Sequence, residues 1–75
     1  MFDYSKLRGR IREKFGTQAQ FAEAMRAEGL NFSDCVCSQK LNNQSEWTQD
    51  EITTACNLLD IPAEEIHLYF FCPMS

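Results

Sequence analysis

The chain has 75 residues, of which 44% are hydrophobic and 12% aromatic, which is enough for one small core without disulfides or a metal. Its formal net charge of −4 is opposite in sign to that of a general nucleic-acid binder. No apolar run approaches the roughly 20 residues that span a bilayer, and residues 1–4 lack the layout of a secretory signal. We therefore expect a cytoplasmic protein without a membrane partner.

Charge is unevenly distributed along the chain. Residues 41–75 hold six carboxylates and no lysine or arginine. Five of the seven cations lie in one short segment, namely Lys6, Arg8, Arg10, Arg12 and Lys14. The molecule is therefore electrically polar, and the basic segment is the part suited to phosphate.

The first predicted helix covers residues 3–15. Its apolar residues recur at the helical period and a glycine follows as a typical stop, namely Leu7, Ile11, Phe15 and Gly16. Gly9 lies inside this helix and costs about 1 kcal/mol relative to alanine. We therefore expect another part of the chain to approach the backbone closely at this glycine.

Two short helices follow the first. Residues 17–20 form a capping-box sequence that opens the second helix, and Gly29 is its expected end. Ser33 caps a third helix, which residues 42–43, both asparagine, bring to an end.

Two more helices complete the predicted domain. A second capping box at residues 48–51 opens a fourth helix, which Asp60 ends. Pro62 suits the start of a fifth helix, and the carboxylates after it suit the positive end of the helix dipole. No segment alternates apolar and polar residues over a useful length, so strands are not expected. The sequence predicts a compact, all-α, five-helix domain over residues 1–75 that ends in a tail at residues 71–75.

Several of these segments resemble short phage-encoded regulators, which are relatives of lambda-type repressors and Cro proteins. The segments are Lys6-Leu7-Arg8-Gly9-Arg10-Ile11, Phe15-Gly16-Thr17-Gln18, Phe21-Ala22, Lys40-Leu41-Asn42-Asn43, Glu46-Trp47-Thr48-Gln49-Asp50-Glu51-Ile52, Ile61-Pro62 and Glu65-Ile66. Together they cover nearly the whole chain. The resemblance implies a lambda-repressor-like helix-turn-helix over about residues 17–43, in which the helix after Ser33 lies in the major groove of DNA.

The resemblance also implies which side chains contact DNA. Base-reading positions fall on the third helix, at Asp34, Cys35, Ser38 and Gln39. Phosphate-contacting positions fall at the start of the second helix and on the third, at Thr17, Gln18 and Lys40. The basic stripe of the first helix, formed by Lys6, Arg10 and Lys14, either contacts phosphates as well or is a solvated helix face.

Two features depart from the pattern of this family. The connection between the second and third helices has about five extra residues, roughly Arg26 to Leu30, so the sequence predicts an enlarged turn. Asp34 and Cys35 occupy positions at which arginine, lysine, threonine or glutamine are the productive base readers, and a carboxylate repels phosphate.

Other site chemistries are not indicated. Cys35 and Cys37 form a Cys-x-Cys step that fits zinc poorly, even with Cys56 and His67 considered as further ligands, so we expect four free thiols and no metal. No nucleophile or phosphate-binding loop accompanies His67, and we expect neither an enzyme nor a cofactor.

Two aromatic segments have a structural and a binding interpretation. Trp47 directly precedes a capping box, so packing as a hydrophobic staple is favoured over an exposed binding anchor. Residues 68–72 are more apolar than a chain end requires. Some of them are expected to seal the core, while the others form a dimer contact or receive another protein.

Two functions of different classes remain open. The first is a phage or prophage transcriptional regulator of the Cro or repressor type, which binds operator DNA as a homodimer formed through the C-terminal helix. The second is a helix-turn-helix protein that has lost DNA binding and acts on another protein. It would serve as an antirepressor or modulator of a repressor, or as an inhibitor of a host defence enzyme such as an anti-CRISPR. The acidic residues 44–65 suit a basic partner of this kind, such as a repressor or a nuclease.

Overall fold

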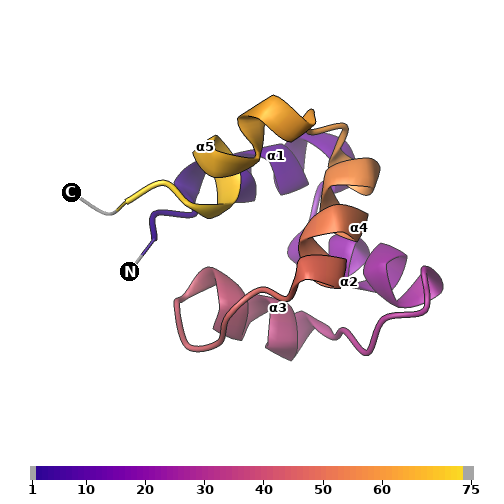
Figure 1. Ribbon diagram of the computed structural model, residues 1–75. Helices are drawn as coiled ribbons and strands as arrows, with labels where there is room; N and C mark the ends of the chain where they lie inside the picture. The colour runs from indigo at the N-terminus through magenta and orange to yellow at the C-terminus, as the bar shows by residue number, and fades with distance from the viewer. Residues whose placement is uncertain (1, 74–75) are drawn as a thin grey trace.

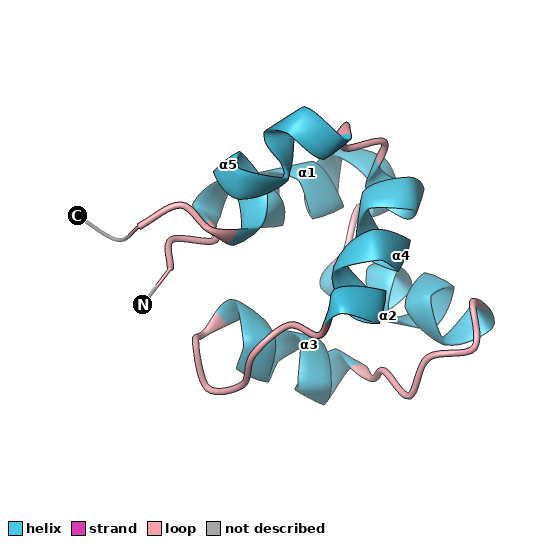
Figure 2. Cartoon of the chain, in the orientation of Figure 1, coloured by secondary structure: helices cyan, strands magenta, loops and turns pink. Residues whose placement is uncertain are grey.

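The computed structural model describes residues 2–73, so residues 74–75 of the predicted tail lie outside the described part. Its elements are α1 (Ser5–Phe15), α2 (Gln18–Ala27), α3 (Asp34–Leu41), α4 (Gln49–Leu59), the 3-10 turn η1 (Ala63–Glu65) and α5 (Ile66–Phe70). Figure 1 shows α5 beside α1 at one end of the molecule and α3 at the other. The five α-helices, and the lack of strands in the described residues, confirm the predicted all-α class (Figure 2).

Three helices begin at hydroxyl caps, as the sequence predicts. The side chains of Thr17, Ser33 and Thr48 accept the amide protons of Gln20, Val36 and Glu51, respectively. At the start of α4 the Glu51 carboxylate also accepts the Thr48 amide at 2.8 Å, which completes the capping box. At the start of α2 the structure shows the hydroxyl half of the box.

The connection between α2 and α3 is enlarged, but it lies further along the chain than the sequence predicts. Helix α2 continues through Ala27, so Arg26 and Ala27 are helical and the connection comprises residues 28–33. Phe32 in this connection is 1% exposed, and its ring lies 6.1 Å from that of Phe21. The added length therefore allows the connection to contribute an aromatic residue to the core.

The core gathers apolar side chains from all five helices and from the connections. Its buried members are Tyr4, Leu7, Ile11, Phe21, Ala22, Met25, Phe32, Cys37, Leu41, Ala55, Cys56, Leu59, Ile61, Tyr69 and Phe70. Trp47 is half-buried against them, and its ring centroid lies 5.9 Å from Phe32 and 5.1 Å from Phe70. The α2–α3 connection and α5 thus meet through this indole.

A buried ion pair joins α3 to the start of α4. The Lys40 ammonium lies 2.9 Å from Glu51 Oε1 and donates to the backbone carbonyl of Glu46 at 2.7 Å. The two residues are only 5% and 9% exposed. Lys40 therefore does not present its ammonium to solvent, in contrast to the phosphate contact expected from the sequence.

The pair yields the first prediction. Lys40→Met should lower the free energy of unfolding by about 3 to 5 kcal/mol, because it leaves the Glu51 carboxylate buried without its cation. Urea unfolding followed by Trp47 fluorescence measures this loss. Lys14→Met is the matched control, since Lys14 pairs with the exposed Asp60, and it should cause a much smaller change. Equal losses in the two variants would contradict the assigned role.

Gly9 lies at an exposed position of α1. A Cβ built at Gly9 meets nothing within 4 Å, so the close backbone approach expected there is wrong. Gly9→Ala should therefore raise the free energy of unfolding by about 0.5 to 1 kcal/mol, because alanine restricts the unfolded chain and favours the helix. The same urea experiment measures the gain, and a loss of stability would show that the position is not open.

Candidate functional site

The exposed face of α3 holds most of the residues that were expected to read bases. Asp34, Cys35 and Gln39 are exposed, whereas Ser38 is half-buried. Cys37 and Leu41, on the other side of the helix, are buried, as the sequence predicts. The face thus presents one carboxylate, one thiol and one amide, while Lys40 of the same helix is buried.

The start of α2 is bound directly to this face. The Gln18 amide donates to Ser38 Oγ at 2.8 Å and to Asp34 Oδ1 at 3.3 Å. The Thr17 hydroxyl is used in capping α2. The structure therefore brings Gln18, Asp34 and Ser38 together in one polar cluster, in which these groups bond to one another.

The predicted basic stripe of α1 lies elsewhere. Arg10 donates from Nε to the carbonyl of Leu59 at 2.8 Å and from Nη2 to the carbonyl of Asp60 at 3.2 Å. The Lys14 ammonium lies 2.8 Å from Asp60 Oδ2, and this bond and charge lower the pKa of Asp60. Lys6 lies over the ring of Tyr69, with its ammonium 5.8 Å from the ring centroid.

These contacts place the stripe against the end of α4 and against α5. Figure 1 shows α5 and the C-terminal end of α4 well apart from α3. The stripe and the α3 face therefore belong to different regions of the surface. The cations at Arg10 and Lys14 also stabilise carbonyls and a carboxylate at the negative end of α4.

A further arginine, Arg8, which sequence analysis did not assign to a site, caps the C-terminal end of α3. Arg8 Nη2 donates to the carbonyl of Leu41 at 3.1 Å and to Asn42 Oδ1 at 2.7 Å. A cation at this position satisfies the last carbonyls of the helix. The sequence shows Arg8 only as part of the basic segment of α1. That pattern does not indicate that its partners are Leu41 and Asn42, more than 30 residues further along the chain.

The four cysteines are free thiols in different surroundings. Cys35 is exposed on α3, and Cys37, two residues further on, is fully buried. Burial raises the pKa of Cys37 to about 12, with a smaller contribution from the charge of Asp34. Burial also raises the pKa of Cys56. Within residues 2–73 no group of three histidine, cysteine or acidic side chains could hold a metal ion.

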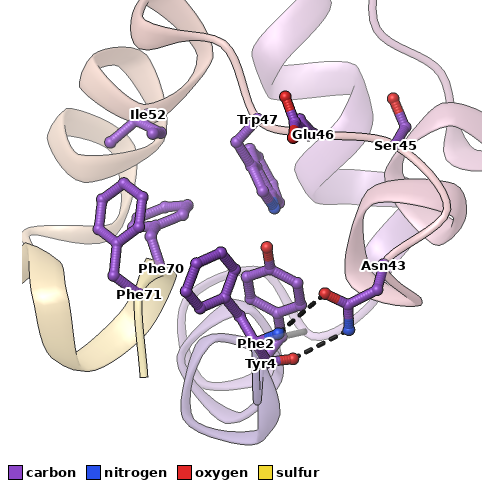
Figure 3. Close-up of a pocket in the computed structure, with 9 residues that line it drawn as sticks. All are labelled: Phe2, Tyr4, Asn43, Ser45, Glu46, Trp47, Ile52, Phe70 and Phe71. Atoms are coloured by element: carbon purple, nitrogen blue, oxygen red, sulfur yellow. Dashed lines mark hydrogen bonds between the residues drawn. The ribbon is translucent and has the colours of Figure 1, made fainter. Parts of the chain in front are cut away.

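A second candidate site lies where the chain ends meet the α3–α4 connection. Sequence analysis predicted a partner contact within residues 68–72 but did not identify the other walls of this site. It is a cleft of about 410 Å³ lined by Phe2, Tyr4, Asn43, Ser45, Glu46, Trp47, Ile52, Phe70 and Phe71 (Figure 3). The Asn43 side chain bonds to both the amide and the carbonyl of Phe2, and Asp3 donates its amide to the carbonyl of Cys72. The sequence signal for this cleft was the excess of aromatic residues at the chain ends, which carries no information on their pairing.

The chain is thus a small, all-helical domain with two consecutive capped helices, α2 and α3. A family model described as "Protein of unknown function (DUF739)" matches residues 1–72. The chain therefore belongs to that family. A comparison with curated protein sequences gives no match. Within residues 2–73 the longest helices have 11 residues, which is too short for a membrane span.

A solved phage structure is similar to this chain. It is the solution structure of the modulator of repression (MOR) of the temperate bacteriophage TP901-1 from Lactococcus lactis. The identity is 43% over 93% of this chain and 88% of that chain, with a TM-score of 0.77. The resemblance to phage proteins noted in the sequence is confirmed to this extent, while the Cro and lambda-repressor type stays a prediction.

The third prediction concerns the thiols of α3. Iodoacetamide at about pH 8 should modify Cys35 before Cys37 and Cys56, because the thiolate is the nucleophile and the two buried thiols hold their protons. Mass spectrometry of peptides from briefly treated protein gives the order of these three thiols, and Cys35→Ser removes the modification assigned to α3. Equally fast labelling of Cys37 in the folded protein would contradict the burial of that side of α3.

Proposed function

We propose that this protein is a phage regulator that binds a repressor protein and changes the repressor's occupancy of its operator. The observation that carries the proposal is the likeness to a phage modulator of repression at 43% identity over 93% of the chain. Of the two functions that the sequence leaves open, this is the one that acts through a protein partner.

The charges of the α3 face support a protein partner over DNA. A DNA-reading helix normally gains affinity from cations beside its base-contacting side chains. Here the cation of α3, Lys40, is neutralised inside the protein by Glu51, and the exposed Asp34 adds a negative charge. The same face is suited to a basic protein surface, such as the one a repressor uses for DNA.

Operator binding by this protein itself is the second candidate. Gln39 is exposed on α3 and is a residue type that pairs with adenine, which favours this candidate. Against it, two of the three cations in the basic stripe bond to the end of α4, and the net charge is −4. Homodimer formation through the C-terminal helix stays a prediction of the sequence.

The fourth prediction separates the two candidates by gel shift, using the repressor encoded nearest this gene and its operator DNA. Alone, the protein should give no operator-specific shift at about 50 or 200 mM salt, whereas a DNA reader would shift the operator and weaken steeply with salt. Added to the repressor, it should either remove or further retard the repressor–operator band. A specific shift by the protein alone would overturn the proposal in favour of the DNA-binding regulator.

The contact with α3 has its own variant and control. Asp34→Arg should weaken repressor binding, because it places a cation on the face that meets a basic partner. Glu64→Arg is the matched control, since Glu64 is another exposed carboxylate in the first turn of a helical element. Iodoacetamide labelling of Cys35 should also slow in the complex. An unchanged labelling rate together with equal binding by both variants would exclude α3 from the interface.

A further inference from the structure

The cleft between the chain ends and the α3–α4 connection has aromatic walls. Phe2 meets Phe71 edge to face with ring centroids 5.7 Å apart, and Trp47 meets Phe70 in the same way at 5.1 Å. Phe2 and Phe71 are 37% and 48% exposed, unlike the buried Phe70. Figure 3 shows these rings and Tyr4 converging on the same space. Side chains that enter it would therefore meet ring edges and faces.

The rim of the cleft carries a negative charge. Among the residues that line it, Glu46 has the one formal charge. Lys40 donates to the backbone carbonyl of Glu46. The side-chain carboxylate of Glu46 has no hydrogen bond or ion pair with the described residues. Burial, and secondly the negative charge of Glu46, raise the pKa of Tyr4. Glu46 therefore supplies the negative charge in the lining of this aromatic cleft.

We propose that this cleft binds an arginine side chain of a protein partner, with the guanidinium at the Glu46 carboxylate and its stem and plane against the aromatic rings. Guanidinium groups are planar, weakly hydrated and able to stack on aromatic faces, so they fit such a combination better than the compact ammonium of lysine. The apolar part of the side chain occupies the remainder of the cleft.

A partner side chain explains the cleft better than a second copy of the chain does. The large exposed apolar residues of the described chain are Phe2, Leu68 and Phe71. Docked cleft to cleft, a second copy would bring two Glu46 carboxylates together, whereas an arginine side chain supplies the opposite charge. The identification of the partner as a repressor rests on the proposed function, but arginine binding itself does not.

The test uses a single signal that reports on the cleft. Trp47 is the one tryptophan, and its indole nitrogen is buried without a hydrogen-bond partner in the described residues. Its N–H gives one cross-peak in a ¹⁵N–¹H spectrum. Titration with N-acetylarginine methylamide should shift this peak with saturation, whereas N-acetylnorleucine methylamide should leave it nearly unchanged.

Two variants make the test specific to the charge. Glu46→Gln should weaken the binding of the arginine derivative at least about threefold, because it removes the ion pair and keeps the size of the side chain. Glu64→Gln removes an exposed carboxylate outside the cleft and should leave the binding as it is. An absent shift, an equal shift with norleucine or unchanged binding by Glu46→Gln would overturn the proposal. Shifts that depend on protein concentration would assign the cleft to a second copy instead.

This inference and the proposed function can fail separately. If this protein binds the arginine derivative saturably but has no effect on the repressor, the cleft proposal stands and the proposed function is wrong. A repressor complex that Glu46→Gln forms as tightly as the unchanged protein, with no effect of the free arginine derivative, would retain the function and overturn the cleft assignment.

Discussion

The buried ion pair between Lys40 and Glu51 is the interaction on which both candidate surfaces depend. One carboxylate oxygen accepts both the Thr48 amide and the Lys40 ammonium, and the same ammonium holds the carbonyl of Glu46. The end of α3, the start of α4 and the segment between them are therefore fixed by one set of contacts. Buried charges are costly unless each is paired, so this part of the chain has little freedom to rearrange while the pair is intact.

The position of Trp47 follows from that constraint. Its segment is held by Glu46 on one side and by the capping box on the other, so the indole is directed into the space between Phe32 and Phe70. The aromatic cleft exists because the chain ends then cover the indole, with Asn43 bonded to Phe2. The contacts of the α3–α4 connection thus position the end of α3 and one wall of the cleft together.

Local signals predicted the helices well, whereas partners distant in sequence limited the prediction of the site. The caps at Thr17, Ser33 and Thr48 act within one turn, so a sequence pattern is sufficient to find them. The role of Phe32 depends on rings supplied by α2 and by the α3–α4 connection, which no local pattern specifies. Arg10 is similar, because its carbonyl partners lie 49 and 50 residues away.

For Lys40, the sequence contained a signal for burial but did not identify Glu51 as the partner of its ammonium group. Cys37, Lys40 and Leu41 share one face of α3 at helical spacing, so the sequence already places this lysine beside buried residues. A phosphate contact was nevertheless expected, because the family resemblance assigned the role and Glu51 was identified only as a cap. In the folded protein, Lys40 of α3 forms an ion pair with Glu51 of α4. Because Lys40 is buried in this pair, α3 has no exposed cation. The exposed face of α3 is left with the negative charge of Asp34, which is the feature that the proposed binding of a basic protein surface uses.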